Sequence, residues 1–217
     1  MKILLPILAA VLGYLLGCIP VGVLVGKLYH NSDIRKSGSG STGTTNVLRT
    51  LGWVPSLLTF AGDCVKGVLA AWLGKLIGGE AGMLAGGFCA VLGHDFPVFM
   101  RFKGGKGIVT SLGITLIICP IVAPFLVVIT IGTVAILHTM SIGSLLATLA
   151  YPILFWIFLP ETANFPLYMI FSAAMAALSV YCHRGNIMRL IRGKENKLDF
   201  AKISKISKEN AIPGKKK

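Results

Sequence analysis

Glycines alternate with hydroxyl side chains in the stretch Lys36–Arg49, which reads KSGSGSTGTTNVLR. Glycine lets backbone N–H groups turn toward one anion because no side chain blocks the approach. Serines and threonines add hydroxyl donors, and Arg49 adds a planar fork that suits a phosphate. A flexible Gly/Ser linker is the alternative interpretation. We predict a phosphate-binding loop with the candidate residues Gly38, Ser39, Gly40, Gly43, Asn46 and Arg49.

A second glycine-rich stretch, GHDFPVFMRFKGGKG, runs from Gly93 to Gly107. Its end places Lys106 among Gly104, Gly105 and Gly107, directly before an apolar run that is expected to be a helix. Free N–H groups and the positive end of the helix dipole would then act together with the lysine on an anion. Anchoring of the loop by its basic residues is the alternative, but it does not require the three glycines.

The third polar stretch, HRGNIMRLIRGKENK, begins at His183. His183 and Asn186 are three residues apart and would share one face of a helix. The arginines of this stretch suit a juxtamembrane anchor, which does not require His183, Asn186 or Glu195. These three residues are therefore further candidates for the site. Within an apolar run, Asp63 and Lys66 are also three apart and are expected to form a structural ion pair.

The composition indicates the compartment in which these stretches lie. Hydrophobic residues make up 54% of the 217, charged residues 13%, and the mean hydropathy is +0.78. A soluble domain carries about 25% charged residues, so this chain is a polytopic membrane protein. The G-x-G-x-x-G at Gly38–Gly43 follows an apolar run, not a strand, which excludes a dinucleotide-binding fold. No metal-ligand spacing is present, and we predict no metal and no cofactor.

The apolar residues fall into separate segments, each a candidate for crossing a bilayer. A membrane-spanning helix needs about 20 residues. The segments are Ile3–Leu28, Trp53–Ile77, Ala81–Met100, Ile108–Cys119, Ile121–Leu137, Ile142–Leu159 and Phe165–Cys182.

The loop charges predict the topology. Basic loops follow the first and third segments, and from His183 onward eleven Lys and Arg stand against three Asp and Glu. The positive-inside rule places all these regions in the cytoplasm if the chain breaks near Pro120. We therefore predict an all-α protein with seven transmembrane helices, the N-terminus outside and the C-terminus cytoplasmic. Residues 1–200 would form a single integral membrane domain, and residues 201–217 a frayed basic cytoplasmic tail near anionic lipid.

The chain closely resembles the PlsY family in three motifs, which are SGSG-x-x-G-T-T-N-x-x-R, GH-x-FPVF-x-x-FKGGKG and HR-x-N-x-x-RL-x-x-G-x-E-x-K. These are bacterial membrane acyltransferases, and the resemblance covers nearly the whole chain. It implies a seven-span fold with a cytoplasmic site that includes Ser39, Arg49, Lys106, His183 and Asn186, with Ser144 as a further position. One departure is Ser41, where the family often has asparagine.

The resemblance implies transfer of a fatty acyl group from acyl phosphate to the 1-hydroxyl of glycerol 3-phosphate, the first acylation of phospholipid synthesis. The partners would be these two substrates and membrane lipid, without nucleic acid, and the location the bacterial inner membrane. The H-x-x-x-x-D motif of other glycerol acyltransferases is absent. A transporter of a phosphorylated or anionic molecule is the alternative, but transporters place their site near the midplane, at a repeat interface.

Overall fold

The computed structural model describes residues 3–159 and 164–210. Within these ranges the regular structure is helical, and no strand occurs. The α-helices are α1 (Leu4–Gly17), α2 (Val21–His30), α3 (Thr44–Leu51), α4 (Trp53–Asp95), α5 (Ile108–Ile118), α6 (Val122–Leu137), α7 (Met140–Phe158), α8 (Phe165–Cys182), α9 (Arg184–Ile191) and α10 (Phe200–Asn210). Two short 3-10 turns, η1 (Ile34–Lys36) and η2 (Val98–Met100), lie in the loops.

Each apolar segment predicted from the sequence folds as helix, with two differences in where helices break. The first segment divides into α1 and α2 beside Pro20, whose ring cannot continue a helix. The second and third segments together form α4, whose chain reverses at Gly78 and Gly79. Gly79 has φ +61, a conformation that favours glycine, and the two arms then meet closely at Gly74 and Gly82. The predicted break near Pro120 separates α5 from α6.

Four stretches are long and apolar enough to cross a membrane, namely Leu4–Tyr29, Trp53–Met100, Met140–Phe158 and Phe165–Cys182. Of these, Trp53–Met100 contains both arms of α4. The helices α5 and α6 are apolar but shorter, with 11 and 16 residues. The integral membrane character is therefore supported, whereas the number of crossings and their orientation stay predictions.

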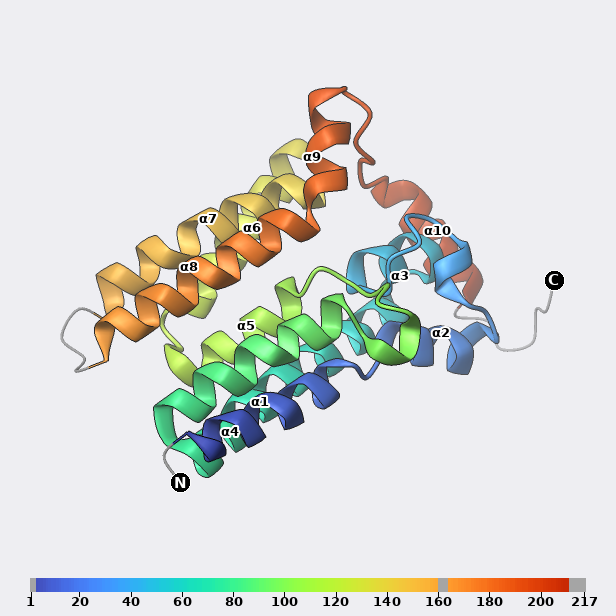
Figure 1. The fold of residues 1–217 in the computed structure, drawn as a ribbon. Helices are drawn as coiled ribbons and strands as arrows, with labels where there is room; N and C mark the ends of the chain where they lie inside the picture. Colours follow the sequence, from blue (N-terminus) through green and yellow to red (C-terminus); the bar gives the residue numbers. More distant parts are fainter. Residues whose placement is uncertain (1–2, 160–163, 211–217) are drawn as a thin grey trace.

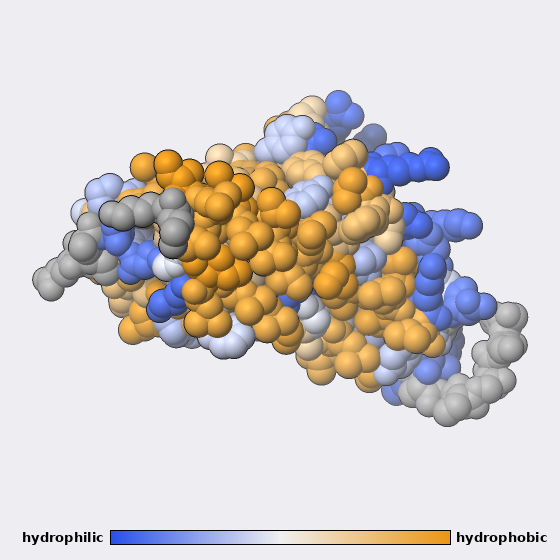
Figure 2. All heavy atoms as spheres, turned by 60° about the horizontal axis from the view of Figure 1, so that its bottom comes forward, coloured by the Kyte–Doolittle hydropathy of each residue, from blue (hydrophilic) through white to orange (hydrophobic). Residues whose placement is uncertain are grey.

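The long helices form two groups, visible in Figure 1 as α1, α4 and α5 on one side and α6, α7 and α8 on the other. In the first group, glycines let backbones touch: a Cβ on Gly13 would strike the backbone of Gly86, and one on Gly113 the backbone of Cys64. A buried apolar cluster that includes Ile114, Val122 and Phe155 connects the two groups. Figure 2 shows apolar residues over the flank of the molecule, with hydrophilic residues gathered mainly toward the end that carries α2, α3 and α10.

The expectation of a frayed tail is wrong for residues 201–210, all of which belong to α10. Ile203 is buried against Leu48 of α3, and Asn210 Nδ2 donates to the carbonyl of Leu51. The short run of apolar residues among the lysines was enough to hold the helix on the bundle. Residues 211–217, the end of the predicted tail, lie outside the described residues, as do residues 160–163 between the last two predicted segments.

Candidate active site

A cavity of about 320 Å³ lies between the two helix groups and combines a polar and an apolar end. The polar end holds Ser39, Arg49, Lys106, His183 and Asn186. The apolar end is lined by residues of α5 to α8, namely Leu112, Leu126, Val127, Ile131, Ala147, Tyr151, Met175 and Ala176. The cavity therefore offers space for a charged head next to space for an apolar chain.

The first glycine loop is organised by the side chain of Asn46, at the start of α3. Its Nδ2 donates to the carbonyls of Ile34, Ser37 and Ser41 at 3.0, 3.2 and 2.8 Å, and its Oδ1 accepts from the N–H of Ser39 at 2.8 Å. The amide is thus occupied within the protein, although it lines the cavity wall. Asn46 therefore supports the loop from within the cavity wall.

The glycines of this first loop permit its path. Gly38 and Gly40 have φ of +61 and +73, where residues with a side chain are strained. A Cβ on Gly38 would also strike the Oδ1 of Asn46. Gly43 precedes α3 and lines the cavity together with Ser39, whereas Gly38 and Gly40 are not among the lining residues.

The second loop presents Lys106 to the cavity by different means. The N–H groups of Gly104 and Gly105 donate to the carbonyls of Asp95 and His94 at 3.1 and 3.0 Å, which fixes the start of the loop on the end of α4. Gly107, with φ +65, precedes α5 and lines the cavity. The Lys106 ammonium reaches the cavity and donates to Asn186 Oδ1.

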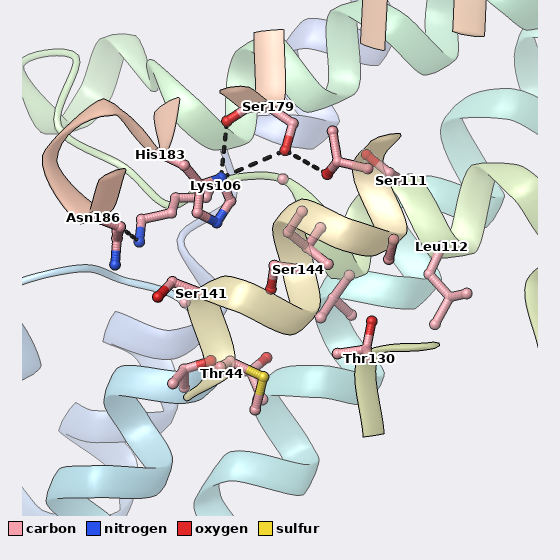
Figure 3. Close-up of a pocket in the computed structure, with 18 of the residues that line it drawn as sticks. Thr44, Lys106, Ser111, Leu112, Thr130, Ser141, Ser144, Ser179, His183 and Asn186 are labelled. Carbon is pink, nitrogen blue, oxygen red and sulfur yellow. Dashed lines mark hydrogen bonds between the residues drawn. The ribbon is translucent and has the colours of Figure 1, made fainter. Parts of the chain in front are cut away.

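His183 lies at the junction of α8 and α9 and is 2% exposed. Its Nδ1 is 2.8 Å from the carbonyl of Ser179, which can only accept, so the hydrogen is on Nδ1 and Nε2 carries the lone pair. Burial, together with the positive charge of Lys106, lowers the pKa of His183 to about 4. The imidazole is therefore neutral at physiological pH and offers one hydrogen-bond acceptor. Figure 3 shows His183 and Lys106 facing the same space.

Asn186 is held by a chain of polar contacts to residues of α7 and α9. Its Nδ2 donates to Glu195 Oε1 at 2.7 Å, and Ser141 donates to the same oxygen at 3.1 Å. Glu195 Oε2 accepts from Arg189 Nε at 2.8 Å. Glu195 thus orients Asn186 and Arg189 and is not itself poised to bind an anion.

Positive charge dominates the polar end. Arg49, Lys106 and Arg189 line it, and Glu195 is the carboxylate nearest to them; Asp63, the other carboxylate in the described lining, is paired with Lys66. Arg49 donates through one terminal nitrogen to the carbonyl of Asn196 at 3.0 Å, and its buried Nε has no acceptor within the described ranges. Burial lowers the pKa of Arg49, and it lowers the pKa of Lys106 to about 8. Arg189 is paired with Glu195, whereas Arg49 and Lys106 have no carboxylate partner among the described residues, which suits an anionic ligand.

Most of the predicted site residues come together at the cavity. Those that line it are Ser39, Gly43, Asn46, Arg49, Lys106, Gly107, Ser144, His183, Asn186 and Glu195. Gly38, Gly40, Gly104 and Gly105 lie behind this wall and shape it. The sequence reasoning missed Ser141 and Ser179 and treated Arg189 only as a possible anchor. Arg189 falls three residues after Asn186, a helical spacing that could have placed it on the same side.

The sequence matches the model of the family described as "Glycerol-3-phosphate acyltransferase" over residues 7–193. The chain belongs to this glycerol-3-phosphate acyltransferase family. A family member from Symbiobacterium thermophilum is 45% identical over 192 residues, which are 87% of this chain and 92% of the relative. One from Thermoanaerobacter sp. (strain X514) is 39% identical over 192 residues, or 88% of this chain and 95% of the relative.

Two crystal structures of a family member, PlsY, described as an integral membrane glycerol 3-phosphate acyltransferase, have the same fold. The glycerol 3-phosphate form has a TM-score of 0.83 and 33% identity, with 92% of this chain and 98% of that chain covered. The lysophosphatidic acid form has a TM-score of 0.80 and 32% identity over the same shares. The resemblance to the PlsY family and the prediction of an all-helical integral membrane protein are confirmed.

Proposed function

We propose that this protein transfers a fatty acyl group from acyl phosphate to the 1-hydroxyl of glycerol 3-phosphate, giving lysophosphatidic acid and phosphate. The observation that carries the proposal is the cavity, in which a cationic end and an apolar end meet in a chain of this family. Both substrates carry a phosphate, and one carries a fatty chain. A site that was only cationic or only apolar would fit neither acyl phosphate nor lysophosphatidic acid, since each has a phosphate and a fatty chain.

The residues of the polar end have separate roles in the proposal. Lys106 holds the phosphate of the donor, and it lies beside the positive end of the α5 dipole. Arg49 engages phosphate with its unpartnered guanidinium edge. Asn186, fixed by Glu195, helps to place glycerol 3-phosphate. The acyl chain extends past Leu112 and Leu126 toward the lipid.

In the reaction, the hydroxyl oxygen bonds to the carbonyl carbon, and the bond from that carbon to the phosphate oxygen breaks. Phosphate leaves with the electron pair, and the hydroxyl proton goes to a substrate phosphate. His183 accepts the hydroxyl's hydrogen bond at Nε2 and aims its oxygen at the carbonyl. Its pKa of about 4 supports this positioning role, because so weak a base does not retain a proton at neutral pH.

The assay that tests the function uses purified, detergent-solubilised protein with acyl phosphate and glycerol 3-phosphate. We expect lysophosphatidic acid and phosphate in equal amounts, with no sealed vesicle present. A transporter would produce neither, so absence of product from folded protein would overturn the proposal. Lys103→Ala, at an exposed lysine of the same loop that does not line the cavity, serves as the matched variant for Lys106→Ala.

For the location, we propose seven crossings of a bacterial inner membrane by a single domain of residues 1–200, with the site and the tail at 201–217 in the cytoplasm. The basic loops and the basic C-terminal region support this orientation. Cysteines introduced at Ser37, Lys103 and Lys194 of a variant without native cysteines test it. They should resist a membrane-impermeant thiol reagent in intact cells and react after lysis. Labelling of any one from outside would contradict the topology.

A further inference from the structure

A buried charged network lies below the second glycine loop and has no role in the reaction described above. Its centre is Lys66, 4% exposed, in the first arm of α4. The ammonium lies 2.8 Å from Asp63 Oδ1, 2.7 Å from His94 Nδ1 and 3.2 Å from the carbonyl of Ile19. Asp63 Oδ1 accepts no hydrogen bond of good geometry, so its contact with Lys66 is an ion pair.

The network fixes the state of His94. A lysine ammonium has only donors, so His94 Nδ1 must accept, and the hydrogen of the ring lies on Nε2. Asp63 Oδ1 lies 2.8 Å from the ammonium of Lys66 and 3.5 Å from His94 Nδ1, so it holds the ammonium beside the imidazole. The carbonyl of Ile19, at the break between α1 and α2, completes the contacts of the ammonium. The orientation of the ring therefore depends on residues from two distant parts of the chain.

His94 is in direct contact with the loop that carries Lys106. Its carbonyl accepts from the N–H of Gly105 at 3.0 Å. A Cβ on Gly105 would collide with Nε2, Cδ2 and Cε1 of the His94 ring. The imidazole is therefore the surface on which Gly105 rests, one residue before Lys106. Both Asp63 and His94 also reach the cavity wall.

The charges of this network are not explained by stability. A buried ion pair often contributes no more to stability than well-packed apolar residues of similar volume. Ionisable groups within membrane helices are costly and usually serve function. The network instead fixes the orientation of the His94 ring, because a hydrogen-bonded imidazole rotates less freely than an apolar side chain of similar size.

We infer that His94 is a positioning residue for Lys106, held in one orientation and one tautomer by Lys66 and Asp63. The network thus sets the affinity for the acyl phosphate more than that for glycerol 3-phosphate. This inference rests on the proposed function of the site. The contacts that support the loop thus run from Asp63 and Lys66, in the first arm of α4, through His94 to Gly105, next to Lys106.

The test compares His94→Asn with the double variant Asp63→Asn and Lys66→Met. His94→Asn keeps an acceptor for Lys66 but removes the ring beneath Gly105. The double variant removes both charges together, so neither is left buried alone. Thr59→Val in α4 is the matched control, because its hydroxyl bonds only to Pro55 of its own helix and does not line the cavity. For each protein, kcat and KM for both substrates and the midpoint of thermal unfolding are measured in one detergent.

We expect His94→Asn and the double variant to lose on the order of 10- to 100-fold in kcat/KM for acyl phosphate. KM for glycerol 3-phosphate should change less than threefold, and Thr59→Val should match the wild type. A purely structural role would instead lower the unfolding midpoint and reduce both substrates' kcat/KM in proportion to folded protein. That result, or an unchanged kcat/KM in His94→Asn, would overturn the inference. If the wild type itself forms no product, the proposed function is wrong. Failure of the proposed function is thereby distinguished from failure of the inference about His94.

Discussion

The two glycine-rich loops at the cavity look alike in sequence and are held in different ways. In the first, one side chain, Asn46, gathers three carbonyls and an N–H, and Gly38 adopts a left-handed conformation beside it. In the second, the backbone of Gly104 and Gly105 bonds to the end of α4, and Gly105 rests on His94. Glycine is therefore needed in the first loop for a left-handed backbone conformation, and in the second for the close approach of the backbone to His94.

The glycines in the sequence therefore do not show by themselves which contacts hold each loop. The first loop depends on one buried amide, so its shape can be lost by a single side-chain substitution. The second depends on main-chain bonds to the end of α4 and on the close approach of Gly105 to the ring of His94, so the sensitive positions are Gly105 and His94. The two loops should therefore respond to different substitutions, and the effects below are ordered from the largest.

Lys106→Ala should have the largest effect, because between the end of α4 and the start of α5 Lys106 is the only residue with a side chain that lines the cavity. We expect kcat/KM for acyl phosphate to fall by on the order of 10²–10³, the usual loss for one group that stabilises developing charge. Steady-state kinetics with Lys103→Ala as the control measure this. Equal losses in both variants would show that the loop acts only through its net charge.

Asn46→Ala should break the first loop while leaving the second intact. Four hydrogen bonds are lost at a residue that is 1% exposed, and we expect about 2–4 kcal/mol lower free energy of unfolding. Denaturant unfolding in detergent, with activity recorded on the folded fraction, measures it. Lys36→Ala, at an exposed position nearby, should leave stability unchanged. A normal stability for Asn46→Ala would contradict the assigned role of this amide.

Gly105→Ala and Asn186→Ala should separate the two substrates. The added methyl group pushes against the His94 ring and displaces Lys106, so KM for acyl phosphate should rise about tenfold and more than KM for glycerol 3-phosphate. Asn186→Ala removes the group that Glu195 fixes, and we expect the opposite bias. Initial rates over a grid of both substrates report the ratio. If both variants affect both substrates equally, the assignment of one loop to one substrate is wrong.

The pH dependence of kcat/KM for acyl phosphate should reflect the titration of Lys106. Its pKa of about 8 means that the free enzyme loses this positive charge as the pH rises above 8. We expect kcat/KM for acyl phosphate to fall about tenfold per pH unit beyond that point. Lys106→Arg, which keeps its charge, should lack this alkaline fall even if its rate is lower. Rates corrected for spontaneous hydrolysis of the donor measure it, and an unmoved fall in Lys106→Arg would assign the titration to another group.

The smallest effect is expected from the cysteines, because the reaction needs no acyl-enzyme. Acyl phosphate already has a good leaving group, and covalent catalysis requires a nucleophile with an adjacent base. Cys18, Cys64, Cys89, Cys119 and Cys182 are free, and none of the described cavity residues is a cysteine. A variant with all five changed to Ala or Ser should keep near-normal kcat. Labelled acyl group trapped on the protein without glycerol 3-phosphate would contradict this mechanism.

The sequence alone indicated the class of this protein and most residues of its candidate site. Apolar segments and Pro120 indicated the helices and the break between α5 and α6, because these signals are local along the chain. Lys106 among glycines, and the pair His183 and Asn186 on one helical face, could be found for the same reason. The expected pairing of Asp63 with Lys66 is confirmed for that reason too.

Only the tertiary structure decided which groups meet. His94 and Lys66 come from opposite arms of α4, and Ser141, Asn186 and Glu195 from segments that no local period relates. Two further contacts also depend on packing between distant elements. Gly104 and Gly105 donate their N–H groups to carbonyls at the end of α4, and α10 packs against α3. The spacing of residues along one helix predicts which of them share a face. The residues that contact this face depend on how the helices pack and cross, and a single sequence does not give the crossing angle.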